Sequence, residues 1–476
     1  MTQQAAPPLW QNILLFVLLV TALGIGYTQF RDRIIPPAPK ADPDARTKEA
    51  GKAPTGIGSP RVPAPLAVTP DSEIVSLGGD KFDLRVALDP LGAGVRSVSL
   101  TQFRPATDRG KPAAGILELV PAAANLQEPA FLLTHYDQKD LLHRPVETLG
   151  RRKWQFVKRA DGTVDGKERQ SAEFATEIDG VRITKTYSLV AGEYHIGLEV
   201  KLSRPKAASA IRDEENQPTK FRYQLTGGKG LPIEGKWYTS TFRNSLVGLE
   251  DDKGYISHRD FQELRSVSVA LGGNAVGKKD DRFIRFAGVA VQYFASVLVV
   301  DENQKDQRFL RGAQPTLETG VLRGRVKPGS LDQTDRVVLV SDDGKTGQTA
   351  YMPRAMEQTK DLFAQRKDLR EGVPVALIYQ HAGFDDKLKE APRVIAQIRV
   401  GAEAEATHAQ WEDDISVRVS TEEFPLLPGA EVTHKYILYH GPVKPSLLGQ
   451  LRGPRAVDDA VVSRYTDTLH PNSPHP

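Results

Sequence analysis

The chain has 476 residues, with 63 lysines and arginines against 60 aspartates and glutamates, and it contains no cysteine. The near balance of charge, without any basic block, argues against a protein dedicated to binding nucleic acid. The lack of cysteine excludes disulfides, zinc ribbons and thiol nucleophiles. The length allows two to four domains, or one large β domain with additions.

The N-terminus carries an uncharged apolar run from Ile13 to Phe30. As a helix it would be about 27 Å long, close to the ~30 Å thickness of the hydrocarbon core of a bilayer. Trp10 and Tyr27 lie near its two ends, where aromatic residues favour the membrane interface. The pattern predicts a transmembrane anchor over residues 1–33. A cleaved signal peptide and a buried core helix are the alternatives.

The charges around this segment conflict with the expectation that the chain after it lies outside the cytoplasm. No lysine or arginine precedes the apolar run, whereas Arg31 and Arg33 follow it. The positive-inside rule alone would place the C-terminal side in the cytoplasm, although the rule weakens when a long domain follows.

Residues 34–70 contain nine prolines among 37 residues, mixed with Ala, Gly, Lys and Asp. Such a composition cannot bury a core. It predicts an extended, semi-stiff linker that holds a folded domain away from the membrane.

Residues 71–445 show the alternation of antiparallel strands. In "YHIGLEVKL" the apolar residues Ile196, Leu198, Val200 and Leu202 share one face. The preceding strand, "VRITKTYSLV", connects to it through a loop of hairpin length. Similar runs recur to "VTHKYILYH", without a fixed repeat. The pattern predicts a mainly β protein built as one large antiparallel sandwich, or two fused sandwiches.

Helical periodicity is rare. Residues Arg354 to Leu369 are compatible with a helix that turns Met356, Leu362 and Phe363 inward. Near the end, the strand in "KYILYHGPVKPSLLGQL" is expected to turn at Gly441-Pro442. A short helix and tail then occupy residues 446–476.

No catalytic, cofactor-binding or metal-binding residues are predicted. The ten histidines are scattered without metal-ligand spacing. His434 and His440 lie an even number of residues apart on one strand and are expected to be surface imidazoles. Asp251-Asp252 and Asp280-Asp281 fit solvated loops better than a glycosidase pair.

Two glycine-containing segments could be taken for anion sites. "GTVDGKER", starting at Gly162, has the wrong spacing for a phosphate loop and predicts a hairpin turn. The segment from Thr226 to Tyr238 precedes no apolar helix and predicts a flexible β loop, with anion binding as the alternative.

Five aromatic residues cluster in the middle of the chain and are expected to belong mostly to the core. The alternative is a groove that accepts an apolar or extended segment. These residues are Trp237, Tyr238, Phe242, Tyr293 and Phe294.

Four stretches, taken in order, resemble the YidC-type membrane protein insertases of Gram-negative bacteria. "GAGVRSVSLTQF" (Gly92 to Phe103) resembles an early strand of that family, and Val181 to Leu202 is similar to its hairpin with a Lys-Thr-aromatic strand. "FAGVAVQYFASVLVV", from Phe286, is similar to its "W-x-G-x-x-x-x-Y-F" strand. "YHGPVKPSLL", from Tyr439, resembles its closing "Y-x-G-P-K-x-x-x-L" turn.

The resemblance implies a large β super-sandwich of galactose-mutarotase-like shape, placed in the periplasm behind a single inner-membrane anchor. It implies a scaffold or chaperone-like role in inserting and folding inner-membrane proteins. Nascent inner-membrane proteins and Sec translocon accessory subunits would be the partners, and no cofactor or enzymatic activity is expected. The family's core of five further transmembrane helices has no counterpart after Leu451, so a truncated or split insertase is expected.

Two alternatives remain open at this point. The first is a free-standing, membrane-anchored binding or chaperone protein on the same sandwich. The second is a carbohydrate-active, mutarotase-like enzyme, which would need histidine and carboxylate groups converging in a cleft.

Overall fold

The computed structural model divides the chain into residues 1–63 and 64–476. The structure describes residues 69–107, 109–135, 149–178, 180–206, 219–234, 243–250, 256–261, 276–277, 282–341, 347–353, 359–381, 393–406, 413–452 and 456–469. The predicted anchor, and the predicted linker up to residue 68, lie outside these ranges. No helix within them is both long and apolar enough to cross a membrane.

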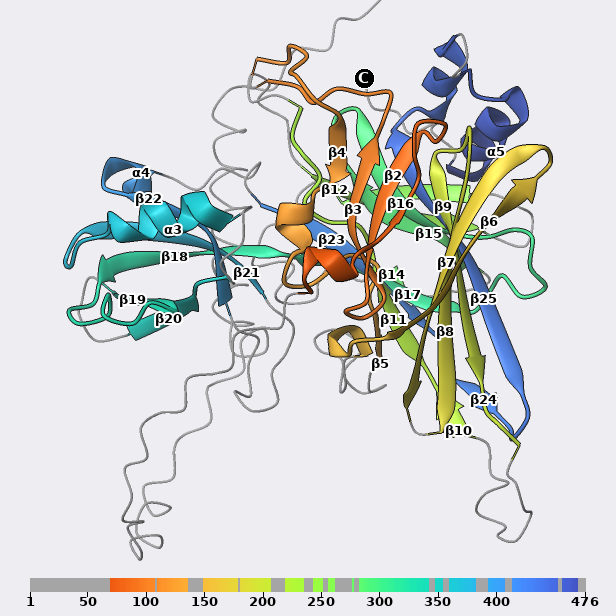
Figure 1. Ribbon diagram of the computed structural model, residues 1–476, viewed down its shortest axis with the longest axis horizontal. Helices are drawn as coiled ribbons and strands as arrows, with labels where there is room; N and C mark the ends of the chain where they lie inside the picture. The colour runs from red at the N-terminus through yellow and green to blue at the C-terminus, as the bar shows by residue number, and fades with distance from the viewer. Residues whose placement is uncertain are drawn as a thin grey trace, which may run out of the picture. The chain divides into compact units, whose positions relative to one another are not determined.

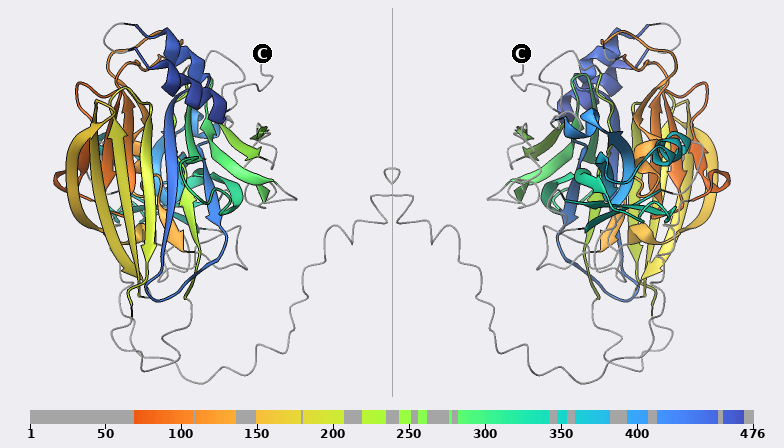
Figure 2. Two further views of the ribbon diagram at one scale, coloured as in Figure 1. Left: turned by 90° about the vertical axis from the view of Figure 1, so that its right-hand side faces the viewer. Right: turned by 90° about the vertical axis from the view of Figure 1, so that its left-hand side faces the viewer.

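Most of the described residues belong to β-strands, and nearly all strand pairs are antiparallel, as predicted (Figure 1). The largest sheet has nine strands there, in the order β13 (Ile256–Phe261), β12 (Asn244–Glu250), β15 (Phe283–Ala290), β16 (Phe294–Val300), β25 (Glu431–Pro442), β9 (His195–Ser203), β8 (Val181–Val190), β7 (Lys167–Ile178) and β6 (Gln155–Val164). Figure 2 shows its long strands β6 to β9 lying side by side with β25.

Smaller sheets accompany the nine-stranded one. A four-stranded sheet runs β1 (Val75–Leu77), β2 (Leu84–Asp89), β3 (Gly94–Leu100), β4 (Leu117–Val120). A five-stranded sheet runs β14 (Val276–Gly277), β17 (Leu310–Leu317), β23 (Ile415–Thr421), β11 (Tyr223–Thr226), β5 (Leu133–His135). A two-stranded ribbon joins β10 (Thr219–Phe221) to β24 (Phe424–Leu426).

Helices are few and short in the described ranges. They are the 3-10 helices η2 (Asp71–Glu73), η3 (Ala122–Asn125), η5 (Leu149–Arg151) and η9 (Pro445–Gln450), and the α-helices α3 (Lys360–Lys367), α4 (Ala402–Glu405) and α5 (Asp459–Leu469).

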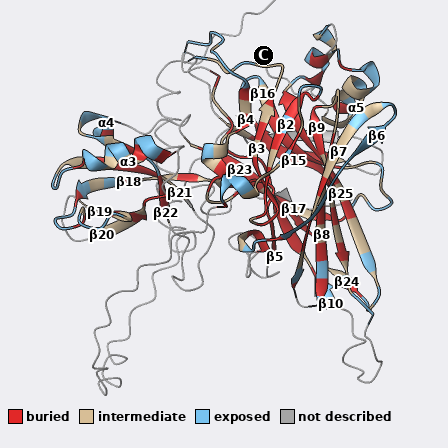
Figure 3. Ribbon diagram, viewed as in Figure 1, coloured by how far each residue is buried: buried red, intermediate tan, exposed pale blue. Residues whose placement is uncertain are grey.

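Buried residues from all three larger sheets belong to one hydrophobic core. Figure 3 colours the buried residues red along the ribbon. On β9 the four apolar residues predicted to share a face are buried and alternate with half-buried neighbours. The hairpins β8–β9 and β6–β7 are also confirmed. The second closes at Asp165 and Gly166, which both have positive φ, as a tight hairpin turn requires.

Strand β25 lies inside the nine-stranded sheet, between β16 and β9. Its second half is buried without alternation, because both of its faces are covered. The prediction that His434 and His440 are surface imidazoles is therefore wrong: they are 3% and 0% exposed. The expected turn at Gly441-Pro442 is also wrong, since Pro442 still pairs with Phe294 and the chain leaves the sheet only afterwards.

A closed barrel that the strand patterns did not predict occupies residues 319–400, at the left of Figure 1. It has its own core. Its strands are β18 (Thr319–Val326), β19 (Arg336–Val340), β20 (Gly347–Tyr351), β21 (Pro374–His381) and β22 (Arg393–Val400). The expected sandwich over 71–445 misses it because barrel strands alternate as sandwich strands do.

Helix α3 belongs to this barrel. It covers the second half of the predicted helix over Arg354–Leu369, and it buries Leu362 and partly buries Phe363 against the barrel core. Met356 lies outside the described residues.

Candidate functional site

A buried tyrosine of helix α5, Tyr465, anchors the helix on the sandwich. Tyr465 is 2% exposed, and its ring packs against that of Tyr439 on β25, with 5.0 Å between ring centroids. Its hydroxyl accepts a hydrogen bond from the N–H of Tyr194 at 3.0 Å and lies 2.7 Å from Nδ1 of His195. The helix is thereby held to the start of β9, in the middle of the nine-stranded sheet.

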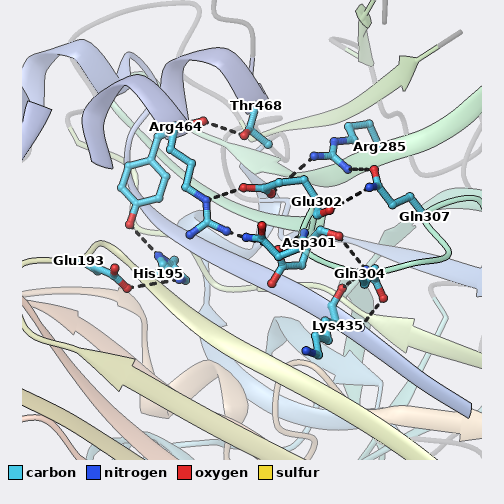
Figure 4. Close-up of polar contacts among 12 residues, drawn as sticks. Glu193, His195, Arg285, Asp301, Glu302, Gln304, Gln307, Lys435, Arg464 and Thr468 are labelled. Carbon is cyan, nitrogen blue, oxygen red and sulfur yellow. Dashed lines mark hydrogen bonds and ion pairs between the residues drawn. The ribbon is translucent and has the colours of Figure 1, made fainter. Parts of the chain in front are cut away.

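His195 is neutral in this site. Burial, with a smaller contribution from the charge of Arg464, lowers the pKa of His195 to about 3. Because Nε2 faces an acceptor oxygen of Glu193, the ring proton is assigned to Nε2, and Nδ1 accepts from the Tyr465 hydroxyl. Nε2 lies 3.4 Å from Oε2 of Glu193, whose pKa is raised by burial. Each polar atom of the imidazole thus has a partner (Figure 4).

Next to this tyrosine, Arg464 joins α5 to the loop after β16. Its Nε lies 2.6 Å from Oε1 of Glu302, and its Nη2 lies 3.4 Å from Oδ1 of Asp301. On the other side, Nη2 of Arg285 lies 3.6 Å from Oε2 of Glu302. Burial raises the pKa of Glu302, but the hydrogen bond from Arg464 and the two guanidinium charges outweigh it, so its pKa is lowered overall.

The loop that carries Asp301 and Glu302 is itself hydrogen-bonded to β25. The side-chain amide of Gln304 donates to the carbonyl of Lys435 at 2.8 Å and accepts from its N–H at 2.9 Å. The N–H of Asp301 donates to the same carbonyl at 3.0 Å. Arg464 therefore binds carboxylates that are already positioned by the central strand of the sheet, as Figure 4 shows.

The whole arrangement is a docking site, defined by Glu193, His195, Asp301, Glu302, Arg464 and Tyr465. It contains an ion-pair network and a buried aromatic anchor, which hold two chain segments together. Sequence reasoning missed it. The available signal was the spacing of Val461, Tyr465 and Leu469, which places three apolar residues on one face of a helix.

The comparison with known families decides what kind of domain carries this site. The family described as "YidC periplasmic domain" matches residues 80–337, which is more than half of the chain. The chain belongs to the YidC periplasmic domain family. The domain is thus one associated with membrane protein insertases, and the resemblance found in the sequence is confirmed.

Two curated relatives of this family member are each named "Membrane protein insertase YidC". The protein from Bordetella petrii is 25% identical over 183 residues, which cover 38% of this chain and 30% of the relative. The protein from Janthinobacterium sp. is 24% identical over 303 residues, which cover 63% and 47%. The chain thus spans less than half the length of either relative.

Solved structures similar to this YidC-type domain include a galactose mutarotase related enzyme from Lactobacillus acidophilus. It has a TM-score of 0.33 and 8% identity, over 77% of this chain and 97% of that one. A TPR-domain containing protein from Parabacteroides distasonis also has a TM-score of 0.33, with 10% identity over 77% and 47%. At such scores the architecture is taken from the strand pairing alone.

The glycine-rich segment of this YidC-type domain is packed, not flexible as predicted. Lys229 is 6% exposed, with Nζ 3.7 Å from Oε2 of Glu318. The N–H of Gly230 donates to Oδ1 of Asp414 at 2.8 Å, and Nε of Arg243 lies 3.6 Å from that oxygen. Its last residues, 235–238, lie outside the described ranges.

This segment braces the two strands that enter and leave the barrel. The N–H of Glu318 donates to the carbonyl of Asp414 at 2.8 Å, and the N–H of Asp414 donates to Oγ1 of Thr319 at 2.9 Å. The buried charges therefore hold together the ends of β17 and β23, from which the chain enters and leaves the barrel.

The other residues singled out in the sequence serve packing. His434 stacks on Phe309 with 3.9 Å between ring centroids, and its Nδ1 lies 2.8 Å from the Tyr223 hydroxyl. Burial lowers its pKa to about 4 and that of His440 to about 3.

Of the five aromatic residues, Phe294 packs against the core, whereas Tyr293 is 50% exposed. The remaining three, Trp237, Tyr238 and Phe242, lie outside the described residues, as do both aspartate pairs. In the described part of the chain, no three His, Cys, Asp or Glu residues gather closely enough to hold a metal ion.

Proposed function

We propose that this chain is the anchor and periplasmic part of a membrane protein insertase, and that it assists insertion and folding of inner-membrane proteins as a scaffold. The observation that carries the proposal is the match to the YidC periplasmic domain family, joined to the docking of α5 on the sandwich. A helix fastened to the sheet through Tyr465 and Arg464 orients the chain that follows it relative to the domain.

A scaffold role fits the chemistry of the docking site better than catalysis does. A general acid or base must reach a substrate proton and titrate near the working pH. His195 lies beside a carboxylate, as a carbohydrate-active enzyme would require, but it is buried under Tyr465 and its pKa is lowered to about 3. The imidazole is held as a structural hydrogen-bonding group.

The proposed partners are nascent inner-membrane proteins and accessory subunits of the Sec translocon, as for the family. The predicted anchor over 1–33 would hold the domain at the inner membrane with its main part in the periplasm. Protease added to spheroplasts is expected to degrade residues 69–469. Protection from that protease would contradict the proposed orientation.

The function is tested by depleting the chain in its host and measuring insertion of a reporter inner-membrane protein by protease protection. Depletion is expected to reduce insertion, and the wild-type chain is expected to restore it. The variant Arg464→Glu, which places an acid against Asp301 and Glu302, is expected to fail.

The matched control is Arg452→Glu. This arginine is exposed and contacts only backbone carbonyls of Gly449 and Leu451 among the interactions described. It is expected to restore insertion as the wild type does. Normal insertion after depletion would favour the free-standing chaperone instead.

A further inference from the structure

The barrel is an insertion at a single point of the five-stranded sheet. Leu317, the last residue of β17, pairs directly with Ile415, the first residue of β23. The intervening chain leaves and returns at neighbouring positions, so it interrupts no other strand pairing of the sandwich.

The order of the barrel strands is that of an OB-fold. Taken as strands one to five, β18, β19, β20, β21 and β22 close in the order 1-2-3-5-4. The third and fifth strands meet in parallel through Tyr351 and Val394, whereas the other pairs are antiparallel. Helix α3 lies between the third and fourth strands. OB-folds bind oligonucleotides and oligosaccharides on the face of their second and third strands.

Charge is distributed unevenly over this barrel. Its five strands contain five arginines and no aspartate, glutamate or lysine. The acidic residues of 319–400 all lie in the connections and in α3. Strands of the nine-stranded sheet, by contrast, carry acids such as Glu173 and Glu199. The strands of the barrel therefore carry a positive charge, which Asp335, directly before β19, offsets at Arg336 alone among the ion pairs described.

The outer face of β19 and β20 presents this charge beside an aromatic ring. Val337, Leu339 and Ala350 are buried in the barrel core, so their neighbours on each strand face outward. The outward pairs are Arg336 with Tyr351, Val338 with Thr349, and Val340 with Gly347. Arg325 lies next to Val340 on β18.

One arginine on this face is already held in a fixed plane. A two-point contact with Asp335 holds it, in which Nε of Arg336 lies 3.1 Å from Oδ1 and Nη2 lies 2.9 Å from Oδ2. Its guanidinium carbon lies 5.5 Å from the centre of the Tyr351 ring. A planar guanidinium on an aromatic face loses less side-chain freedom when it binds a carboxylate.

We propose that the outer face of β19 and β20 binds an anionic glycan, an extended chain of amino sugars that carries carboxylates. Arg325, whose Nη1 donates to the Gly372 carbonyl at 2.8 Å, and Nη1 of Arg336, the guanidinium nitrogen without a contact to Asp335, would bind the carboxylates. Tyr351 with Val338 and Val340 would contact the apolar faces of the sugar rings. The choice of a glycan over a nucleic acid rests on the periplasmic location in the proposed function. The barrel would then hold the insertase domain against the cell-wall polymer.

Sedimentation with peptidoglycan sacculi tests the proposal. The full chain, purified in mild detergent, is expected to sediment with sacculi and much less with chitin, a neutral glycan of related backbone. Arg336→Glu and Tyr351→Ala are each expected to weaken binding about fivefold to tenfold. Arg336→Gln, which removes the charge at similar size, is expected to weaken binding too, whereas Tyr351→Phe, which keeps the ring, is expected to retain it; circular dichroism verifies folding.

The matched control is Lys367→Glu, which makes the same change of charge on an exposed residue of α3. It is expected to leave sedimentation unchanged. Equal loss with this variant, equal binding to chitin, or preferred binding to single-stranded DNA or anionic vesicles would overturn the proposal. The binding assay does not depend on membrane orientation, so the insertion assay can fail while this result stands.

Discussion

The hydroxyl of Tyr465 lies 2.7 Å from Nδ1 of His195, although the two residues are 270 positions apart in the chain. The contact joins the helix at the end of the described chain to a strand in the middle of the sheet. It makes the docking of α5 a measurable part of the stability of the domain.

Removing that hydroxyl isolates its contribution. Tyr465→Phe leaves Nδ1 of His195 and the N–H of Tyr194 buried without their partner. We expect a loss of about 2 kcal/mol in the free energy of unfolding, measured with urea. Tyr293→Phe, at a half-exposed ring, is the control and should cost less than about 0.5 kcal/mol. Equal losses in the two variants would show that the buried hydroxyl makes no special contribution.

A double-mutant cycle measures the ion pair. For Arg464→Ala and Glu302→Ala we expect a coupling energy of about 1 kcal/mol at pH 7, because both side chains are partly exposed. The pKa of Glu302 is lowered in the folded state. The coupling should therefore be complete above 4.5, the ordinary pKa of glutamate, and should disappear as the pH falls through the lowered value.

The exposed pair of Lys167 and Asp458, with 3.8 Å between Nζ and Oδ2, provides the comparison. The coupling energy of Lys167 and Asp458 should be near zero at pH 7 and also in acid. A coupling for Arg464 and Glu302 that persists unchanged in acid would contradict the assigned charge state of Glu302.

Glu234 predicts a pH dependence of the opposite sign. Its carboxylate is 7% exposed beside the β15–β16 turn, where Oε1 accepts from the N–H of Tyr293 at 3.3 Å. Burial raises the pKa of Glu234 from 4.5 to about 7, although these backbone hydrogen bonds lower it. Above pH 4.5 the unfolded chain releases this proton first, so stability falls as the pH rises toward 7.

The predicted loss over that window is at most about 3 kcal/mol. Glu234→Gln cannot ionise, so its free energy of unfolding should lack this contribution, and it should exceed that of the wild type at pH 8. Urea unfolding at pH 4.5 and pH 8 measures the difference between the two proteins. An identical change in both would show that Glu234 does not titrate in this range.

The strand patterns predicted the sandwich well where one face of a strand is covered. Ile196, Leu198, Val200 and Leu202 alternate because the other side of β9 is only half-buried. Residues Tyr436 to His440 do not alternate, because β25 lies inside the sheet with both faces covered. Burial of His440 follows from that position, which local spacing does not report.

The apolar patterns of the sequence did not predict the barrel or the docking site, for a different reason. Barrel strands have the same period of two as sandwich strands, and closure depends on pairs distant in sequence such as Tyr351 and Val394. The docking site likewise depends on which segments the topology brings beside Tyr465.

Deleting the barrel tests whether it is an independent insertion. A variant that lacks residues 319–413 and joins Glu318 to Asp414 through Asn-Gly should keep β17 and β23 paired. Calorimetry should show one unfolding transition with the midpoint of the wild-type sandwich. A variant that is recovered only as aggregates would indicate that the sandwich needs the barrel to fold.

The position of β25 sets an order of events during synthesis. This strand joins β16 on one side and β9 on the other, yet it spans residues Glu431–Pro442 and follows every other described strand in the chain. Until it emerges, the strands β6 to β9 and the strands β13, β12, β15 and β16 form separate ribbons, each with an open edge. Almost the entire domain must therefore be synthesised before its largest sheet can close, and α5, which is synthesised after β25, packs on a sheet that has only just been completed.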